Sequence, residues 1–409
     1  MTSASPPVPP AGRPAVERWV ERHLDGLYAG EAAGSAVFRG GQAAADLALA
    51  LFDVAGYAAR RNEVWPEIRR AASRLSPYIR HGLLPLPRVW AAVQGPERDV
   101  AAFRDELLWQ EYARHVYARL GGRTRSGTRY VREASSTEGD AWDSEMACIA
   151  LGVSELHGDG WVVNQARMWL ASHWSIRHGM DWRVGEERFF RHLLDGSRAA
   201  NRLGWQWTVG TGTGRPYGFS RRQVERRAPG LCPRCRVQAS CPIEDPPGGE
   251  DALAPIEADP LVGSDPDPDR TAGPRRPERR GTPEMVWITA ESLGGDDPAL
   301  RAHPRFPAVF VFDAPLLRRL GLSGKRLVFL AETLADLAGR RALEVLVGDP
   351  VALLRGRAVA ATFAPVPGWR SRAAAIEPVE IDPWPWLRRP HGGSVASYSA
   401  WRRAADRAP

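Results

Sequence analysis

The stretch DWRVGEERFFRHLLDGSRAANRLGWQW, residues 181–207, carries the strongest evidence for the fold. It lies in a block, residues 15–240, whose apolar side chains recur every three or four positions, as in FRDELLWQEYARHVYARL (103–120). That spacing is typical of helices with one buried face, so the block is predicted to be helical. The chain has 16 tryptophans, many of them between Trp90 and Trp207. So many indoles in one region exceed what a core requires, and some are expected to have a chemical role.

Length and composition narrow the setting. A chain of 409 residues can form two domains with separate cores. It has no apolar run of about eighteen residues, and its first residues, MTSASPPVPPAGRP, lack a basic region followed by an apolar one, so we expect a cytoplasmic protein without a membrane partner. In that compartment thiols stay reduced, and clustered cysteines favour a metal over disulfides. The net charge of +7 permits an anionic partner such as nucleic acid, but Lys325 is the only lysine and a GC-rich genome explains an arginine excess equally well.

The pattern changes twice along the chain. Residues 1–14 are Pro-rich and predicted to be disordered, and residues 15–244 form the helical domain. Residues 245–283 are rich in Pro, Gly, Asp and Arg and are predicted to be a disordered linker. From 284 to 409, strand-like runs (MVWITA, AVFVF, LEVLVGD and AVAATFA) alternate with helices such as KRLVFLAETLADLAGRR. The predicted fold class is therefore mainly α with α/β, in which an all-helical domain precedes a small Rossmann-like parallel domain.

Five motifs in the helical block occur in an informative order. They are SRLSPYIRHGLL (73–84), ELLWQEY (106–112), GWVVNQARMW (160–169), DWRVGEERFF (181–190) and DGSRAANRLGWQW (195–207). Together they resemble the flavin-binding domain of the photolyase and cryptochrome family. VWITAESLGGDDPAL (286–300) and the strands after it resemble a shortened form of the family's N-terminal α/β antenna domain, and GGSVASYSAWRRAA (392–405) resembles the segment that leads into the flavin domain. Because these parts come last here, we infer a circular permutation joined by the linker at 245–283.

The resemblance implies a bound FAD. Hydroxyl and backbone N–H groups near a helix start suit a pyrophosphate, and a plain helix cap is the alternative for SRLS. Asp195 matches the acid at the flavin ring edge, with Arg167 as its expected cation, and Asn201 matches the residue that faces flavin N5. The implied FAD-binding residues are Tyr57, Ser73, Leu75, Ser76, Asn164, Arg167, Asp195 and Asn201.

The resemblance also assigns a role to some of the tryptophans. In this family a chain of indoles relays electrons to the excited flavin. Trp205 matches the member nearest the flavin and Trp182 the next, while Trp142 and Tyr130 are candidates for the outer member. Trp161, Trp169 and Trp174 are expected to be core residues.

Family resemblance implies a light-driven lyase that repairs cyclobutane pyrimidine dimers in DNA. Glu106 and Trp109 are three residues apart on a predicted helix and share a face; they match the residues that hold the dimer. Asn164, Met168 and Trp207 match further cavity residues, and the dimer would be flipped out of the duplex. Phosphates would be held by Arg215, Arg221 and Arg222, unless this run is a solvated helix face paired with Glu225.

Three departures from the family pattern keep an alternative open. Gln110 and Gln165 replace arginines, and Ser197 replaces the second acid of a DGD motif. Each change removes a charge-assisted hydrogen bond worth about 1.5–3 kcal/mol. A cryptochrome-like blue-light receptor that signals to a protein partner is therefore the second hypothesis. Whether the α/β domain holds a second, antenna chromophore is not specified by any motif.

Three of the four cysteines fall within LCPRCRVQASCPIE (231–244), and the fourth is Cys148. The spacing does not match paired zinc knuckles. One cysteine before the helix that leads into the GWVVNQARMW motif and three after the flavin motifs resemble the iron–sulfur branch of bacterial photolyases. That resemblance implies a [4Fe–4S] cluster on Cys148, Cys232, Cys235 and Cys241, and structural zinc or unligated thiols are the alternatives.

Overall fold

The computed structural model describes residues 5–136, 139–245 and 252–407, and these divide into two compact units. The sheet unit comprises Met1–Phe52, Arg74–Ala92 and Asp267–His391. The helical unit comprises Asp53–Ser73, Val93–Pro266 and Gly392–Pro409. Within the described residues, no helix combines the length and the apolar character needed to cross a membrane.

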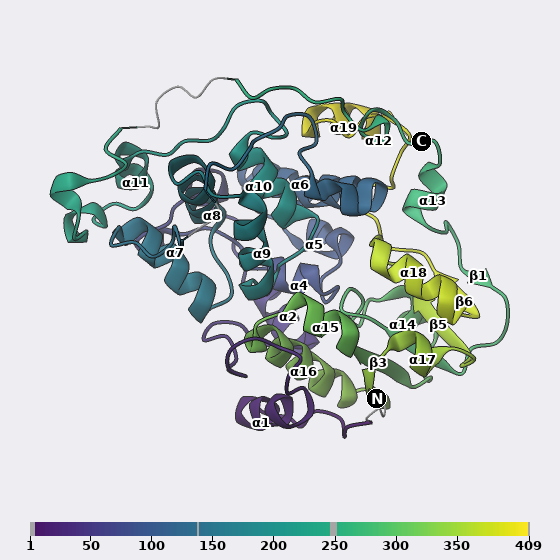
Figure 1. Cartoon of the computed structure of the whole chain (residues 1–409). Coiled ribbons are helices and arrows are strands. Elements are labelled where there is room, and N and C mark those ends of the chain that lie inside the picture. Colours follow the sequence, from purple (N-terminus) through teal and green to yellow (C-terminus); the bar gives the residue numbers. More distant parts are fainter. Residues whose placement is uncertain (1–4, 137–138, 246–251, 408–409) are drawn as a thin grey trace. The chain divides into compact units, whose positions relative to one another are not determined.

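Six strands form the single sheet of the sheet unit, in the order β1-β6-β5-β2-β3-β4 (Figure 1). All neighbouring strands are parallel except β1 and β6. The strands are β1 (Glu278–Arg279), β2 (Met285–Ile288), β3 (Ala308–Asp313), β4 (Leu343–Gly348), β5 (Val359–Thr362) and β6 (Glu380–Asp382). The helices are α1 (Arg13–His23), α2 (Gln42–Ala50), α4 (Ser76–Arg80), α5 (Leu86–Ala92), α13 (Pro268–Ala272), α14 (Pro298–Ala302), α15 (Ala314–Leu320), α16 (Gly324–Ala338), α17 (Pro350–Leu354) and α18 (Pro367–Ile376). The predicted parallel α/β fold is confirmed.

The apolar runs of the sequence explain the core of this sheet. The first five residues of β3 are all buried, as expected for a central parallel strand with both faces covered. α16 buries its apolar stripe and packs against α1, α2 and β4. Short helices start at aspartates that accept a hydrogen bond from the first turn, as Asp313 does from Leu316.

Helices make up the helical unit. They are α3 (Tyr57–Arg60), α6 (Glu97–Leu120), α7 (Ala147–Gly158), α8 (Asn164–Ser172), α9 (Trp182–His192), α10 (Ala200–Val209), α11 (Arg221–Arg227), α12 (Pro260–Gly263) and α19 (Tyr398–Ala405). Short 3-10 segments lie at Glu67–Arg69, Gly121–Arg125, Cys232–Arg234 and Gln238–Ser240, and a π-helical turn, η3, lies at His173–Arg177. α10 packs against α6, α8 and α9, which places it at the centre of this bundle.

The predicted disordered linker is wrong for its described part, residues 252–283. Backbone hydrogen bonds join Val131 to Ala254 at 3.0 Å and Arg129 to Ile256 at 3.0 Å, so this stretch runs beside an extended segment of the helical unit. Further on, Asp259 and Asp267 cap α12 and α13, each of which has proline in its first turn. Proline and aspartate lower the average hydrophobicity of the segment and so favoured a prediction of disorder. In the structure these residues begin short helices. Residues 246–251 of the predicted linker lie outside the described residues.

The N-terminal expectation is also corrected. Pro6 and Pro9 are buried, and the indole N–H of Trp19 donates to the carbonyl of Pro7 at 2.9 Å, so residues 5–14 are ordered against α1. Residues 1–4 of the predicted disordered segment lie outside the described residues.

The predicted domain boundaries at 244 and 284 do not match the compact units. α1 and α2, which were expected in the flavin domain, belong to the sheet unit. Glu332 on α16 accepts from Arg13 at 2.7 Å and from the Gly40 backbone at 2.8 Å, and Asp336 accepts from the Gln42 backbone at 3.0 Å. Amphipathic patterning identifies a helix but not the element against which it packs, so the sequence could not have indicated this partner.

Candidate functional site

The pairing expected between Asp195 and Arg167 is present in the helical unit. Arg167 on α8 donates to an Asp195 carboxylate oxygen at 2.7 Å and to the Val162 carbonyl at 2.7 Å. The side chain of Asp195 is 6% exposed, so the ion pair is largely removed from water. A buried carboxylate is retained when a cation and further hydrogen bonds compensate for its desolvation. This pair could therefore present a fixed hydrogen-bonding edge to a flavin ring.

Asn201, near the start of α10, is buried beside a charge network that sequence reasoning missed. Its amide nitrogen lies 3.5 Å from Glu186, a residue that is 2% exposed. Arg198 donates to both Glu186 oxygens at 2.9 and 3.1 Å, and Arg202 reaches the same carboxylate at 3.2 Å. Glu186 lies in the GEERFF motif, and its pairing with two arginines of SRAANR was a signal that could have been noticed. Ser197, at the position of the missing acid, accepts from the Ala200 backbone at 3.1 Å instead.

The predicted phosphate-binding residues are divided between the two units. In the sheet unit, Leu75 is fully buried and holds the N-cap position of α4, where its side chain makes no capping bond. The serine hydroxyls of SRLS therefore do not occupy the helix-cap position, contrary to the alternative considered for this motif. Arg74 has φ of 57°, a left-handed conformation that costs energy for a residue with a side chain and is often found at functional sites. Ser73 belongs to the helical unit.

Tyr57, also in the helical unit, is buried at the start of α3 and meets Phe103 edge to face at 5.1 Å. Burial raises the pKa of its hydroxyl, and the Glu106 carboxylate raises it further. Arg61 forms an ion pair with Glu106 at 3.3 Å and lies 6.0 Å from the Tyr57 ring centroid. The structure thus brings together a predicted phosphate-binding residue, a predicted catalytic residue and an arginine that sequence reasoning had not selected.

Glu106 and Trp109 lie on one face of α6, as their spacing predicts. Removal from water raises the pKa of Glu106, and the positive charge of Arg61 opposes that shift. Trp109 is 38% exposed, and one face of its ring stacks on Tyr398 of α19 with centroids 4.1 Å apart. A partly exposed carboxyl group beside a flat aromatic surface can recognise a ring that offers polar edge groups.

The remaining predicted cavity residues lie on α8 and on α10, and α10 packs against α6. Asn164 at the start of α8 and Trp207 on α10 are exposed, and Met168 is half-buried. Gln165, at one position of a missing arginine, is buried and donates to the Tyr217 hydroxyl at 2.9 Å. Tyr217 in turn donates to Gln223 at 2.7 Å, and its ring lies 5.5 Å from that of Trp207. Gln165, Tyr217 and Gln223 thus form a neutral hydrogen-bond chain.

The three tryptophans expected in the electron relay are buried and Tyr130 is half-buried, but the ring contacts differ from the expectation. Trp142, a candidate for the outer member, is 3% exposed and lies 6.4 Å from Trp205, ring centroid to ring centroid. It is therefore a neighbour of the inner tryptophan and not a surface terminus. Trp174, expected to be a core residue, continues the contact at 5.0 Å from Trp142. Gly185 lets α9 cross this cluster, because a Cβ atom there would lie 2.3 Å from the Trp205 ring.

The four cysteines line one pocket of the helical unit, which holds about 340 Å³ of empty space, part of it open to solvent. Cys148 comes from α7, and the other three come from the turns between α11 and Ile243. Burial, followed by the neighbouring cysteines, raises the pKa of Cys148 to about 12. The Ala147 backbone donates to the Cys235 sulfur at 3.4 Å. The four cysteines thus surround one pocket, and their ligation of a cluster stays a prediction.

The three arginines predicted to bind DNA differ in their exposure and in their ion pairs. Arg215 and Arg222 are exposed, whereas Arg221 pairs with Glu225 at 2.9 Å and with Glu244 at 2.8 Å and lines the cysteine pocket. Arg221 therefore makes the ion pairs expected of a paired helix face, and contact with DNA stays a prediction for all three arginines. The i,i+4 spacing of Arg221 and Glu225 is the reason for their ion pair.

Comparisons with known proteins agree with the motifs. Residues 103–225 match the family described as the FAD binding domain of DNA photolyase. The chain is 33% identical over 150 residues to a deoxyribodipyrimidine photo-lyase of Streptomyces griseus, which covers 35% of this chain and 33% of that protein. It is 32% identical over 156 residues to the enzyme of the same name from Agrobacterium fabrum, covering 35% and 32%. The chain thus spans about a third of the length of these curated relatives.

Solved structures show similar likenesses. An archaeal photolyase from Sulfolobus tokodaii with two FAD molecules is 23% identical, with a TM-score of 0.43 over 54% of each chain. A bacterial class III photolyase from Agrobacterium tumefaciens is 24% identical, with a TM-score of 0.38 over 48% of this chain and 41% of that one. Residues 103–225 of this chain are therefore similar to the FAD binding domain of DNA photolyase.

Proposed function

We propose that this protein binds FAD and uses blue light to split cyclobutane pyrimidine dimers in DNA. The observation that carries the proposal is the pairing of Glu106 with the exposed ring of Trp109 on one face of α6, next to Tyr57 and Arg61. An acid and an aromatic plane in that arrangement suit a flipped-out pyrimidine dimer, which offers polar edges and apolar faces. The relatives named as deoxyribodipyrimidine photo-lyases support the same reaction.

The residues of the helical unit fit FAD. Arg167 and Asp195 offer a buried, neutralised ion pair, and Asn201 is buried near the helix start of α10. Bound FAD would supply the electron that splits the dimer and would take it back afterwards. Asp195 and Asn201 would orient the flavin ring, with Arg167 holding the Asp195 side chain in position. Ser73, Leu75, Ser76 and Tyr57 are the residues proposed for the phosphates.

The protein's own part in repair is recognition. Glu106 would hydrogen-bond a polar edge of the pyrimidine, and its ion pair with Arg61 would keep the side chain in place. Trp109 would pack against the dimer with the ring face not covered by Tyr398. Asn164, Met168 and Trp207 would line the same cavity, and Arg215 and Arg222 would contact backbone phosphates.

Repair is tested directly with the reduced, FAD-loaded protein. It is given dimer-containing single-stranded and duplex DNA under blue light, and loss of dimers is measured against a dark control. We expect light-dependent loss, and we expect Glu106→Gln to lower its yield while FAD content is unchanged. Intact dimers in both DNA forms, after illumination of protein shown to contain reduced FAD, would rule out the lyase.

For the cysteine pocket we propose a [4Fe–4S] cluster bound by Cys148, Cys232, Cys235 and Cys241. The four residues line one mostly apolar pocket, and sulfur ligands favour iron–sulfur clusters or zinc. In the described part of the chain, no three of these sulfurs converge within 4.8 Å. Tetrahedral zinc would bring thiolates to about 3.8 Å from one another, given Zn–S bonds of about 2.3 Å. A cubane spreads its ligands more widely because each thiolate binds a different iron.

A cryptochrome-like receptor is the second candidate function. Tyr398 covers one face of Trp109, and Gln165 is committed to Tyr217, so two positions expected to serve DNA or flavin make contacts within the protein. If repair fails but light still reduces the flavin, a light-dependent change in binding to a protein partner is the expected activity.

We also propose that the family's domain order is circularly permuted in this chain. The strands β2 to β6 follow the helical residues in sequence, and Gly392–Pro409 returns to the helical unit after the sheet. The α/β part would be the counterpart of an antenna domain.

A further inference from the structure

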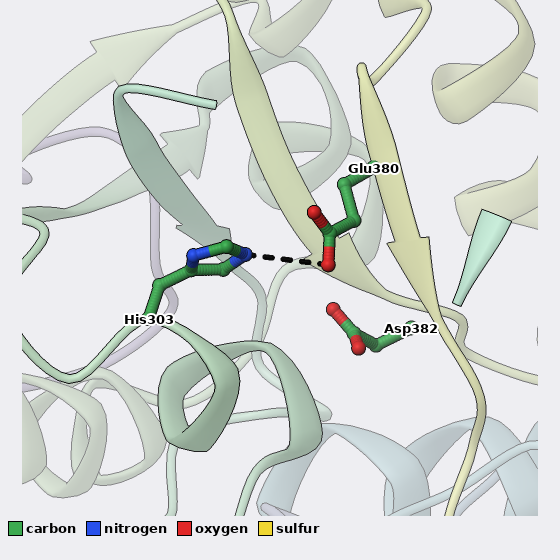
Figure 2. A group of neighbouring side chains, drawn as sticks. All are labelled: His303, Glu380 and Asp382. Atoms are coloured by element: carbon green, nitrogen blue, oxygen red, sulfur yellow. Dashed lines mark ion pairs between the residues drawn. The ribbon is translucent and has the colours of Figure 1, made fainter. Parts of the chain in front are cut away.

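Three side chains from two segments of the sheet unit turn toward one another (Figure 2). Glu380 and Asp382 come from β6, and His303 directly follows α14. One ligand atom of each residue lies within 4.8 Å of those of the other two. None of the three belongs to the flavin or cysteine residues described above.

The fold places these groups together for simple reasons. Residues two apart on a strand point to the same side of a sheet, so Glu380 and Asp382 share a face. On the neighbouring strand β5, Thr362 is the register partner of Asp382, and its hydroxyl accepts from the Ala299 backbone of α14 at 3.0 Å. α14 is thereby held over this face of β5 and β6, and its C-cap residue, His303, faces the two carboxylates.

The converging atoms are buried and lack conventional hydrogen bonds. Glu380 is 1% exposed and Asp382 is 3% exposed. The atoms Glu380 Oε1, Asp382 Oδ2 and His303 Nε2 are each buried without a hydrogen-bond partner, and His303 Nε2 lies 3.3 Å from Glu380 Oε1. Buried charged groups are costly unless they are paired or coordinate a metal. His303 Nε2 and Glu380 Oε1 form an ion pair, and a bound cation would also compensate for the second buried carboxylate, that of Asp382.

The surrounding charges leave the pocket negative. Arg279, the cross-strand partner of Glu380 on β1, lies 3.2 Å from its outer oxygen Oε2, and its own side chain is 64% exposed. A third carboxylate, Asp297, is 5% exposed and interacts electrostatically with Asp382 and with Arg341.

We propose that His303, Glu380 and Asp382 bind one divalent transition-metal cation of the Mn²⁺ type. One imidazole and two carboxylates form a mixed nitrogen and oxygen donor set, which suits such ions and disfavours the softer metals that cysteine binds. Ligands held about 2.1 Å from a metal are separated by about 3.0–3.4 Å, which agrees with the observed 3.3 Å between His303 and Glu380. The Asp382 oxygen must move slightly inward to join them. Such an ion would link the end of α14 to β6, and water would complete its coordination.

Manganese is the appropriate test ion, because its electron paramagnetic resonance separates this site from the cysteine pocket. Full-length protein freed of loosely bound metal with a chelator is titrated with Mn²⁺, and the loss of the free-ion signal is counted. We expect one bound Mn²⁺ per chain, and pulsed measurements should detect a ¹⁴N coupling from the histidine. Binding should also raise the thermal midpoint of the sheet unit, since an ion that binds only the folded state stabilises it.

Matched variants assign the signal to these residues. Asp382→Asn and His303→Gln should each weaken Mn²⁺ binding at least tenfold, and His303→Gln should abolish the ¹⁴N coupling. Glu344→Gln, which removes a carboxylate from β4 in the same sheet, should bind as the unaltered protein does. The proposal is overturned if the unaltered protein does not retain Mn²⁺, or if the bound ion has no nitrogen ligand. Both of these outcomes are measured on the unaltered protein, so a misfolded variant cannot obscure them.

Discussion

Trp109 and Tyr398 stack face to face, with ring centroids 4.1 Å apart and planes inclined by 11°. The Tyr398 hydroxyl donates to the carboxylate of Asp105, one turn before Trp109 on α6. A residue of the last helix thus holds the tryptophan that is proposed to meet the substrate. The stack already fixes the orientation of the Trp109 ring in the free protein. A bound base would therefore not have to restrict the motion of that ring.

Removing that support should weaken lesion binding. Aromatic pairs contribute about 0.5–1.5 kcal/mol beyond their buried area, so Tyr398→Ala should raise the Kd for dimer-containing DNA by about two- to twelvefold. Tyr398→Phe keeps the stack and should bind nearly as the unaltered protein does. Fluorescence anisotropy with a labelled dimer-containing oligonucleotide measures both values. Tighter binding by Tyr398→Ala would mean instead that Tyr398 blocks the site, as the receptor hypothesis would have it.

The Arg167–Asp195 pair makes a prediction about flavin content. Asp195→Asn leaves a largely buried arginine without its counter-charge, a change that costs about 3–5 kcal/mol in buried pairs. We expect the variant to be isolated with little FAD, which the flavin absorbance per protein after gel filtration would report. Asp140→Asn breaks a more exposed pair with Arg188 and serves as the control. Equal FAD content in all three proteins would remove Asp195 from the proposed site.

Individual strands and helices could be predicted from the sequence. The elements against which they pack, when these are distant in the chain, could not. The strands β2 to β5 fall within the apolar runs that predicted them, because a buried parallel strand needs such a run. The packing of α1 against α16, by contrast, depends on Glu332 meeting Arg13, residues more than three hundred positions apart in the chain. The spacing of apolar residues along the chain cannot predict that contact.

In the candidate site, too, residues within a motif were predicted and their partners from distant segments were not. Glu106 and Trp109 were found because residues three apart share a face of a helix, and Arg167 and Asp195 were found because both lie in motifs that resemble those of the family. Tyr398 was missed as a partner of Trp109, since its segment was considered only for its place in the domain order. Short helices in residues 252–283 were missed because averaged composition hides individual capping residues.

The cysteine pocket should contain iron. We expect about four iron atoms per chain and absorption at the blue edge that persists after flavin removal, both of which are lost in Cys148→Ser. Met146→Leu alters the same pocket without removing a sulfur ligand and should retain the iron. Elemental analysis of protein purified without oxygen decides the question. One zinc per chain and no iron would show that the cluster proposal is mistaken.

The tryptophan contacts predict the route of light-driven flavin reduction. Trp142 touches both Trp205 and Trp174, so it can carry an electron toward the inner indole. Trp142→Phe should slow flavin photoreduction in the presence of an external donor, and Trp205→Phe should slow it further. Trp161→Phe, in a buried residue outside this cluster, should leave the rate unchanged. An unchanged rate in Trp142→Phe would assign the relay to Trp182 alone.

The buried His173 in the π-helical turn should make stability fall in mild acid. Burial, and then His178 and Arg177, lower the pKa of His173 from 6.5 to about 3. Below pH 6.5 the unfolded chain therefore binds a proton that the folded chain does not, so the free energy of unfolding decreases as the pH falls toward 3, by at most about 1.4 kcal/mol per pH unit. In His173→Phe this contribution is absent, and the difference in stability between pH 7 and pH 5 should shrink. Urea unfolding at the two pH values measures it, with the exposed His157→Gln as control. If His173→Phe loses as much stability on acidification as the unaltered protein, the acid sensitivity arises from other groups.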